Sequence, residues 1–222
     1  MKPKNLCFLF LFFVSTITKA GFLLLPMDET SQQNHLKAYG ITYWCLDKNY
    51  KASWLLNYRG GSFLLLDAPE IRKECQIRGV RFDAVSDSEE AELLNLIASP
   101  SQNMESVLLE KAPKIAVYTP KGKQPWDDAV TLVLTYAEIP FTAVYDEEVL
   151  SDQLLLYDWL HLHHEDFTGQ YGKFYGTYKN TPWYIEQKKE AELLAKKLGF
   201  AKVSDEKGAV AQKISHFVIG GG

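Results

Sequence analysis

The stretch from residue 114 to residue 145, KIAVYTPKGKQPWDDAVTLVLTYAEIPFTAVY, decides the fold of the second half of the chain. Lys114–Tyr118 is a short apolar run typical of a buried strand, and Phe141–Tyr145 is a second one. Between them, apolar residues of 126–137 recur every three to four positions, which is the period of a helix that covers a sheet. Pro140 ends that helix. Strand, helix and strand in this order predict a parallel pair of strands, because the helix carries the chain back across the sheet.

The same alternation continues along the chain. Tyr157–Leu162 is the third predicted strand, and a helix capped by Thr181 extends to Gly199. A last strand, His216–Ile219, is predicted just before three glycines. Residues 111–222 are therefore predicted to form a doubly wound α/β domain with a parallel sheet. In such a domain, ligands bind at the carboxyl ends of the strands.

Residues 21–110 have a different pattern and are predicted to form a small α+β region. Its clearest element is a β-hairpin, in which two apolar runs, Ser53–Tyr58 and Ser62–Leu66, are joined by Arg59-Gly60-Gly61. Paired glycines favour such a turn because they adopt the positive φ angles that it needs. The remaining predicted elements are a strand at Phe22–Leu25, helices from Thr30 or Ser31 to about Trp44, at Pro69–Arg78 and at Ser88–Ala98, a strand at Val80–Val85, and a linker at Ser99–Asn103.

The first twenty residues have the pattern of a secretory signal peptide. Lys2 and Lys4 give a positive start, Leu6–Val14 is almost wholly apolar, and Thr18-Lys19-Ala20 supplies small residues at a cleavage site. Roughly ten apolar residues are too few to cross about 30 Å of hydrocarbon as a helix. The alternative is a buried N-terminal strand or helix. We predict an exported protein, in the periplasm, on the outer surface or secreted, whose mature chain starts at Gly21 and keeps no stable membrane anchor.

The charge balance argues against nucleic acid as a partner. The chain has 24 basic and 28 acidic residues, and residues 1–20 contain three of the basic ones, so 21 remain against 28 and the mature net charge is −7. Nucleic-acid binding depends on neutralising phosphates with Lys and Arg. Two cysteines remain in the mature chain, Cys45 and Cys75, which either form a disulfide in an oxidising compartment or stay as buried thiols.

The densest group of chemistry-bearing side chains is the sequence His161-Leu162-His163-His164-Glu165-Asp166, at the carboxyl end of the third predicted strand. Residues two apart in a strand share a face, so His161 and His163 are expected to point the same way. The pattern suits a general base oriented by a carboxylate, or a zinc site with His161 and His163 as ligands. A solvated loop is the third interpretation, and no other cofactor is expected. The candidate catalytic residues are His161, His163, His164, Glu165 and Asp166.

Two glycine-containing loops are weaker candidates for binding an anion. Lys121-Gly122-Lys123 precedes a predicted helix N-terminus, where unpaired N–H groups attract negative charge. Arg59-Gly60-Gly61 has the composition of an anion nest. Neither loop has the spacing of a phosphate-binding motif, and a plain turn is the simpler interpretation of each.

Four segments of the chain resemble a family of exported Bacteroidetes proteins that is named asparagine synthetase B. They are Met27-Asp28-Glu29-Thr30, Asn34–Gly40, Leu55–Gly61 and, above all, Lys114–Phe174. The resemblance covers essentially the whole mature chain. It implies that the parallel sheet of residues 111–222 is flavodoxin-like, of the class I glutamine amidotransferase-like type, and that this chain is about the first half of a longer protein.

In that fold, a turn from a strand into a helix presents a cysteine nucleophile, which His and Glu support. The resemblance implies that Gly220, Gly221 and Gly222 begin this turn, with the cysteine beyond Gly222. If His216–Ile219 is a strand of the parallel sheet, the terminal glycines and the His161–Asp166 group are expected at a common rim, at the carboxyl ends of the strands. The sequence lacks two features of a genuine synthetase of that name, because position 2 is Lys rather than Cys and no Ser-Gly-Gly-x-Asp-Ser loop is present.

The leading expectation is an exported amidotransferase-like protein that hydrolyses an amide C–N bond. One alternative is a non-catalytic module that binds a small molecule, a peptide or a partner protein. The other is the reaction of the family name, glutamine-hydrolysing asparagine synthesis.

Overall fold

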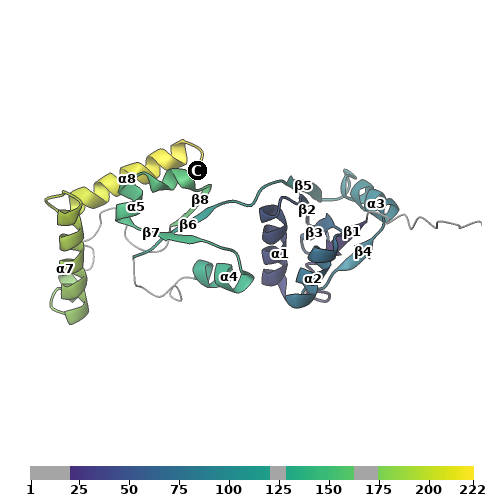
Figure 1. The fold of residues 1–222 in the computed structure, drawn as a ribbon, viewed down its shortest axis with the longest axis horizontal. Coiled ribbons are helices and arrows are strands. Elements are labelled where there is room, and N and C mark those ends of the chain that lie inside the picture. The colour runs from purple at the N-terminus through teal and green to yellow at the C-terminus, as the bar shows by residue number, and fades with distance from the viewer. Residues whose placement is uncertain (1–20, 121–128, 163–174) are drawn as a thin grey trace, which may run out of the picture.

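The computed structural model describes residues 21–120, 129–162 and 175–222. These residues form a mixed α/β structure with two sheets that follow one another along the long axis of the molecule (Figure 1). The strands are β1 (Phe22–Leu25), β2 (Ala52–Leu56), β3 (Ser62–Leu66), β4 (Asp83–Val85), β5 (Glu105–Leu109), β6 (Ile115–Tyr118), β7 (Thr142–Val144) and β8 (Trp159–Leu162). The helices are α1 (His35–Asp47), α2 (Pro69–Ile77), α3 (Asp87–Ile97), α4 (Ala129–Ala137), α5 (Asp146–Leu150), η2 (Gln153–Leu156, a 3₁₀ helix), α6 (Tyr175–Tyr178), α7 (Pro182–Lys197) and α8 (Val203–Ile219).

The first sheet is antiparallel throughout, with the strand order β4-β1-β3-β2-β5. The predicted hairpin is confirmed, because β2 and β3 pair with Leu55 opposite Ser62. Side chains of β1 alternate between its faces: Leu23 and Leu25 pack under α1 and α2, whereas Leu24 packs with the residues that α3 covers. Both faces of this sheet are therefore buried, which explains why its inner strands read as continuous apolar runs.

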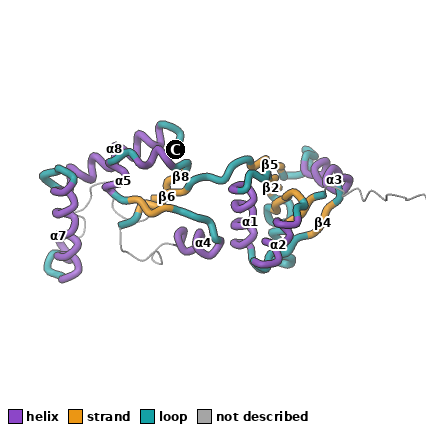
Figure 2. Tube along the Cα trace, in the orientation of Figure 1, coloured by secondary structure: helices purple, strands orange, loops and turns teal. Residues whose placement is uncertain are grey.

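The second sheet is parallel, with the strand order β7-β6-β8, as the alternation of strands and helices predicts. On one face, Ile115 and Val117 of β6 pack against Leu134 of α4. On the other, Ala116 and Tyr118 pack with residues of α5, η2 and α8. The connection from β6 to β7, through α4, therefore covers one face of the sheet. The connection from β7 to β8, through α5 and η2, covers the other face and carries the chain back past β6, so the sheet is wound in both directions from β6. Figure 2 shows the loop of residues 110–114 that joins the two sheets.

Two local predictions in particular differ from the structure. The predicted last strand, His216–Ile219, is wrong, because these residues are the end of α8. A run of four apolar residues fits a strand or a helix equally well, and only the wider spacing of Val210, Ile214 and Phe217 on the buried face reveals the helix. The first helix begins at His35 rather than at Thr30 or Ser31.

Strand β5 has no counterpart in the sequence-based prediction. It is the outermost strand of the antiparallel sheet, where it pairs only with β2, and its residues are largely exposed. An exposed outer strand carries little of the alternating apolar signal that identifies inner strands.

A close contact between α1 and α4 joins the two sheets. Gly40 of α1 lies so near the carbonyl oxygen of Ala137 that a Cβ atom added to Gly40 would be 1.8 Å from it. Beside this contact, Lys37 forms a 2.6 Å ion pair with Glu138, and the Tyr43 hydroxyl donates a 2.8 Å hydrogen bond to the carbonyl of Pro113. The absence of a side chain at Gly40 is therefore what permits the two helices to meet at this distance.

The helices of the described ranges include none that is both long enough and apolar enough to cross a membrane.

Candidate functional site

The carboxyl ends of the parallel strands are the place where this fold can build a site. Strand β6 is paired on one side with β7 and on the other with β8, and the two crossovers lie on opposite faces. In open α/β sheets, ligands bind in a crevice outside the carboxyl ends of the strands, at the point where the strand order reverses. In this protein that position lies between the ends of β6 and β8, at Tyr118 and Leu162, which are register partners.

His161 lies at this position, one residue before the end of β8. Its register partner on β6 is Val117, which packs on the α4 face, whereas Leu162 packs with the cluster under α8. His161 is half-buried and lies on the α4 face of the sheet. Its orientation opposite to Leu162 agrees with the strand alternation expected from the sequence.

The other predicted residues of this group, His163, His164, Glu165 and Asp166, lie outside the described residues, as does the Lys121-Gly122-Lys123 loop. Of the two zinc ligands predicted from the sequence, His161 is described and His163 is not. Among the residues that the structure does describe, no group of three or more His, Cys, Asp or Glu side chains is arranged to hold a metal ion.

The three terminal glycines do not meet His161. Near its start, α8 contacts the carboxyl ends of β6 and β7 through Lys207, and further along it contacts Asp152, next to η2, through Lys213. The helix therefore runs away from the carboxyl ends, as Figure 1 also shows. Gly220 comes 13 residues after Lys207, about 20 Å along the helix axis. The common rim that the sequence suggested for the glycines and His161 does not form.

A buried polar cluster lies at the carboxyl ends of β6 and β7, on the α8 face. Lys207 of α8 donates hydrogen bonds to Asp146 at 2.6 Å, to the Tyr118 hydroxyl at 3.1 Å and to the Tyr145 hydroxyl at 3.2 Å. The Tyr118 hydroxyl donates in turn to the second oxygen of Asp146. Lys207 is 3% exposed and Asp146 is 1% exposed. All three ammonium protons are used, so the pair has the supporting hydrogen bonds that a buried ion pair requires.

Glu206 is the remaining member of this cluster, and its environment is unlike that of Asp146. It is also 1% exposed, and within the described part of the chain its Oε1 atom has no hydrogen-bond partner. Burial raises the pKa of Glu206 to about 7, and the neighbouring carboxyl of Asp146 adds to the shift, whereas Lys207 opposes it. Burial and the charge of Asp146 likewise raise the pKa of Tyr118 far above its usual value, so this hydroxyl stays protonated and remains a hydrogen-bond donor.

Sequence reasoning missed this cluster, and only part of it left a signal. Tyr118 and Tyr145 end two predicted strands, and Asp146 follows directly, so polar groups at the carboxyl ends of the sheet were visible in the sequence. Glu206 and Lys207 gave no signal, because charged residues in a helix usually face solvent.

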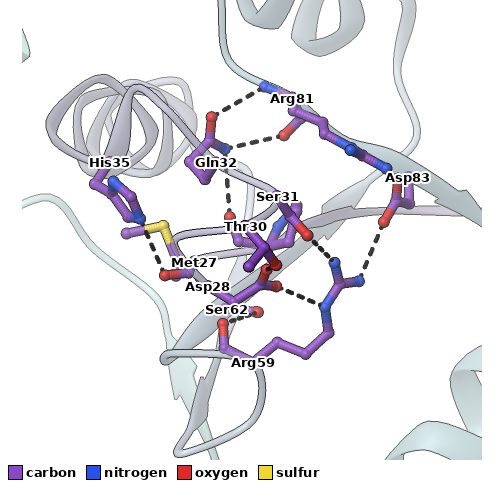
Figure 3. Close-up of polar contacts among 11 residues, drawn as sticks. Met27, Asp28, Thr30, Ser31, Gln32, His35, Arg59, Ser62, Arg81 and Asp83 are labelled. Atoms are coloured by element: carbon purple, nitrogen blue, oxygen red, sulfur yellow. Dashed lines mark hydrogen bonds and ion pairs between the residues drawn. The ribbon is translucent and has the colours of Figure 1, made fainter.

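A second polar network lies in the antiparallel half, and Figure 3 shows how it holds the loop before α1. The Arg59 guanidinium donates to Asp28 at 2.9 Å, to Asp83 at 3.2 Å and to Ser31 at 2.9 Å. Hydrogen bonds from Ser31, from Thr30 and from Arg59 hold the pKa of Asp28 well below its usual value. Two carboxylates accept from the Arg59 guanidinium, and the backbone N–H groups of Gly61 and Ser62 both donate to the carbonyl of Tyr58. Because an anion nest uses backbone N–H groups, these contacts favour a structural anchor over the anion nest considered from the sequence.

The same network brings together two segments that carry the family resemblance. The Met27 N–H donates to the Arg59 carbonyl at 3.0 Å, and Gly60, which has a φ of +79°, faces the Met27 carbonyl with no room for a Cβ atom. Beside it, the buried amide of Gln32 donates to the carbonyls of Pro26 and Arg81 (Figure 3). These contacts explain why glycine is required at this position of the turn.

Neither cysteine of the described chain is poised for chemistry. Cys45 and Cys75 are free thiols in one apolar core, and both are completely buried. Burial raises the pKa of each thiol to about 12. A thiol with so high a pKa is protonated at neutral pH and is a poor nucleophile.

Comparison of the chain with family models, with curated proteins and with solved structures gives no match.

Proposed function

We propose that this protein is an exported α/β protein, with a flavodoxin-like sheet of the amidotransferase-like type, that binds a small polar ligand at the carboxyl ends of its parallel strands. The observation that supports it is the winding of the sheet: the connection from β6 to β7 covers one face, and the connection from β7 back to β8 covers the other. In open α/β sheets, the ligand-binding crevice lies where the strand order reverses in this way. His161 stands beside this crevice.

Hydrolysis of an amide C–N bond is the second candidate, and His161 is the observation that favours it. A half-buried imidazole at the carboxyl end of a strand is suited to accept a proton during attack on an amide. Both described cysteines are buried thiols with a raised pKa, so neither of them is the nucleophile in this mechanism. Glutamine is the first amide to test, because glutamine-dependent asparagine synthesis also begins with hydrolysis of this side chain.

The ligand site is tested by replacing His161 with alanine in the processed protein. We expect a panel of amino acids and primary amides, including glutamine and asparagine, to contain a ligand detectable by isothermal calorimetry. Loss of a hydrogen bond to a charged or polar ligand costs about 1.5–3 kcal/mol, so His161→Ala should bind about 10- to 100-fold more weakly. Release of ammonia from an amide of the panel distinguishes the hydrolase from the binding module.

His216→Ala is the matched control for this experiment, because His216 is exposed on α8, away from the crevice. It should retain affinity within about twofold. Equal binding by the His161 variant and the wild-type protein would rule out this position as the ligand site.

Export is tested by the amino terminus of the protein after expression in a bacterium. We expect a mature chain that begins at Gly21, recovered outside the cytoplasm, because the residues before it have the composition of a signal peptide. A cut at this point leaves β1 complete, since the strand begins at Phe22. Replacing Ala20 with tyrosine should leave the precursor uncut, because the cleavage site needs a small residue there. A cytoplasmic product that still begins at Met1 would contradict the proposal.

A further inference from the structure

The cluster at the start of α8 holds more negative than positive charge. Asp146 of α5 and Glu206 of α8 are both 1% exposed, and among the residues that the structure describes the single cation that faces them is Lys207. The other titratable groups packed there are the phenols of Tyr118 on β6 and Tyr145 after β7, which are neutral hydrogen-bonding groups when protonated. With both carboxyls ionised, the buried cluster would carry a net charge of −1, and burying an unpaired charge is costly.

The contacts identify which carboxyl is unpaired. Asp146 accepts from Lys207 with one oxygen and from Tyr118 with the other. Glu206 has an oxygen with no partner among the described residues, and the carboxyl of Asp146 is a neighbour. Two carboxyls share a hydrogen bond only if one of them carries a proton. The proton that brings the buried cluster to zero net charge is therefore on Glu206.

We propose that Glu206 is a proton-binding site that controls the docking of α8 on the parallel sheet: α8 is held firmly while Glu206 is neutral, and its hold weakens when this carboxyl releases its proton to solvent. The proposal is independent of the ligand at the carboxyl ends, and it concerns a helix that covers one face of the same sheet through Val210, Ile214 and Phe217.

The sign of the effect follows from the direction of the pKa shift. In the docked state the pKa of Glu206 is about 7, and once α8 separates from the sheet, the pKa of the exposed carboxyl returns to its ordinary value of 4.5. A group whose pKa is raised by docking stabilises the docked state fully below 4.5, and this contribution is lost as the pH rises to about 7. The docking equilibrium should therefore weaken by about tenfold per pH unit in this window, up to about 300-fold in total, and then level off.

Amide hydrogen exchange of the full-length protein from pH 5 to pH 8.5 measures this docking directly. After correction for the intrinsic exchange rate, we expect the protection of α8 in the wild-type protein to fall up to about pH 7 and then to remain constant. Glu206→Gln keeps the shape of a neutral carboxyl, so its α8 protection should not change with pH and should be at least as high as that of the wild-type protein at pH 5. Asp205→Asn is the matched control, one residue away and exposed, and it should follow the wild-type curve.

The proposal is overturned if wild-type protection does not depend on pH, or if Glu206→Gln shows the same dependence as the wild-type protein. Should Glu206→Gln not fold, the carboxyl carbon of Glu206 in the wild-type protein decides the question by NMR. A midpoint near pH 7 supports the proposal, and a midpoint near pH 4.5 overturns it.

Discussion

Replacing Lys207 with methionine is expected to lower the free energy of unfolding by about 3–5 kcal/mol, because it leaves the carboxylate of Asp146 buried without a counter-ion. Methionine has a similar length and keeps the apolar stem of the side chain, so the loss reports the ammonium group rather than a cavity. The loss is measured by urea denaturation. It should be larger at pH 8 than at pH 6, because Glu206 is then ionised as well.

Lys213→Met is the matched control for this variant. Lys213 is on the same helix and pairs with Asp152, but that pair is exposed to solvent, and exposed pairs contribute less than about 1 kcal/mol. In a further variant, replacing Asp146 with asparagine together with Lys207→Met removes both charges and should cost less than the sum of the two single changes. If Lys207→Met costs no more than Lys213→Met, the cluster does not stabilise the fold in the way we describe.

Replacing Gly40 with alanine is expected to cost about 2 kcal/mol and to separate α1 from α4. The added methyl group would lie 1.8 Å from the carbonyl oxygen of Ala137, which is a backbone atom that cannot rotate away. Overpacking of this kind typically costs about 1–3 kcal/mol, and occasionally more, and it outweighs the gain of up to about 1 kcal/mol that alanine gives over glycine inside a helix. The change in stability is measured by denaturant unfolding.

Gly208→Ala separates the steric effect from helix propensity. Gly208 is inside α8, and an added Cβ atom would meet no atom within 4 Å. This variant should gain about 0.5–1 kcal/mol. Gly40→Ala, but not Gly208→Ala, should also break the ion pair between Lys37 and Glu138. This loss should appear as faster amide hydrogen exchange or faster proteolysis near α4. A Gly40→Ala protein as stable as Gly208→Ala would show that the two helices are not in close contact.

Much of the fold was predictable because its signals are local. The hairpin of β2 and β3 is specified by two apolar runs around paired glycines, and the parallel order of β6 and β7 is specified by the helix between them. Pro182 at the start of α7 and Gly199 beyond its end likewise mark that helix within the sequence itself. These features need no knowledge of distant residues.

The candidate site was predictable only in part. The sequence placed His161 at the carboxyl end of a strand, opposite in direction to Leu162, and the structure agrees. It also joined His161 to the terminal glycines by reading His216–Ile219 as a strand, and this failed because those residues complete the buried face of α8. A short apolar run does not specify its own secondary structure; the surface against which it packs decides.

What the sequence alone determined is therefore the local order of strands, helices and turns, since backbone preference and apolar period act over a few residues. Only the tertiary structure decided which charges are buried and which helices touch. Glu206 and Lys207 look like ordinary surface charges until Asp146, Tyr118 and the burial of α8 surround them, and Gly40 looks like a weak point in a helix until Ala137 lies against it. Burial and close contact depend on residues that are far apart in the chain, and no local pattern records them.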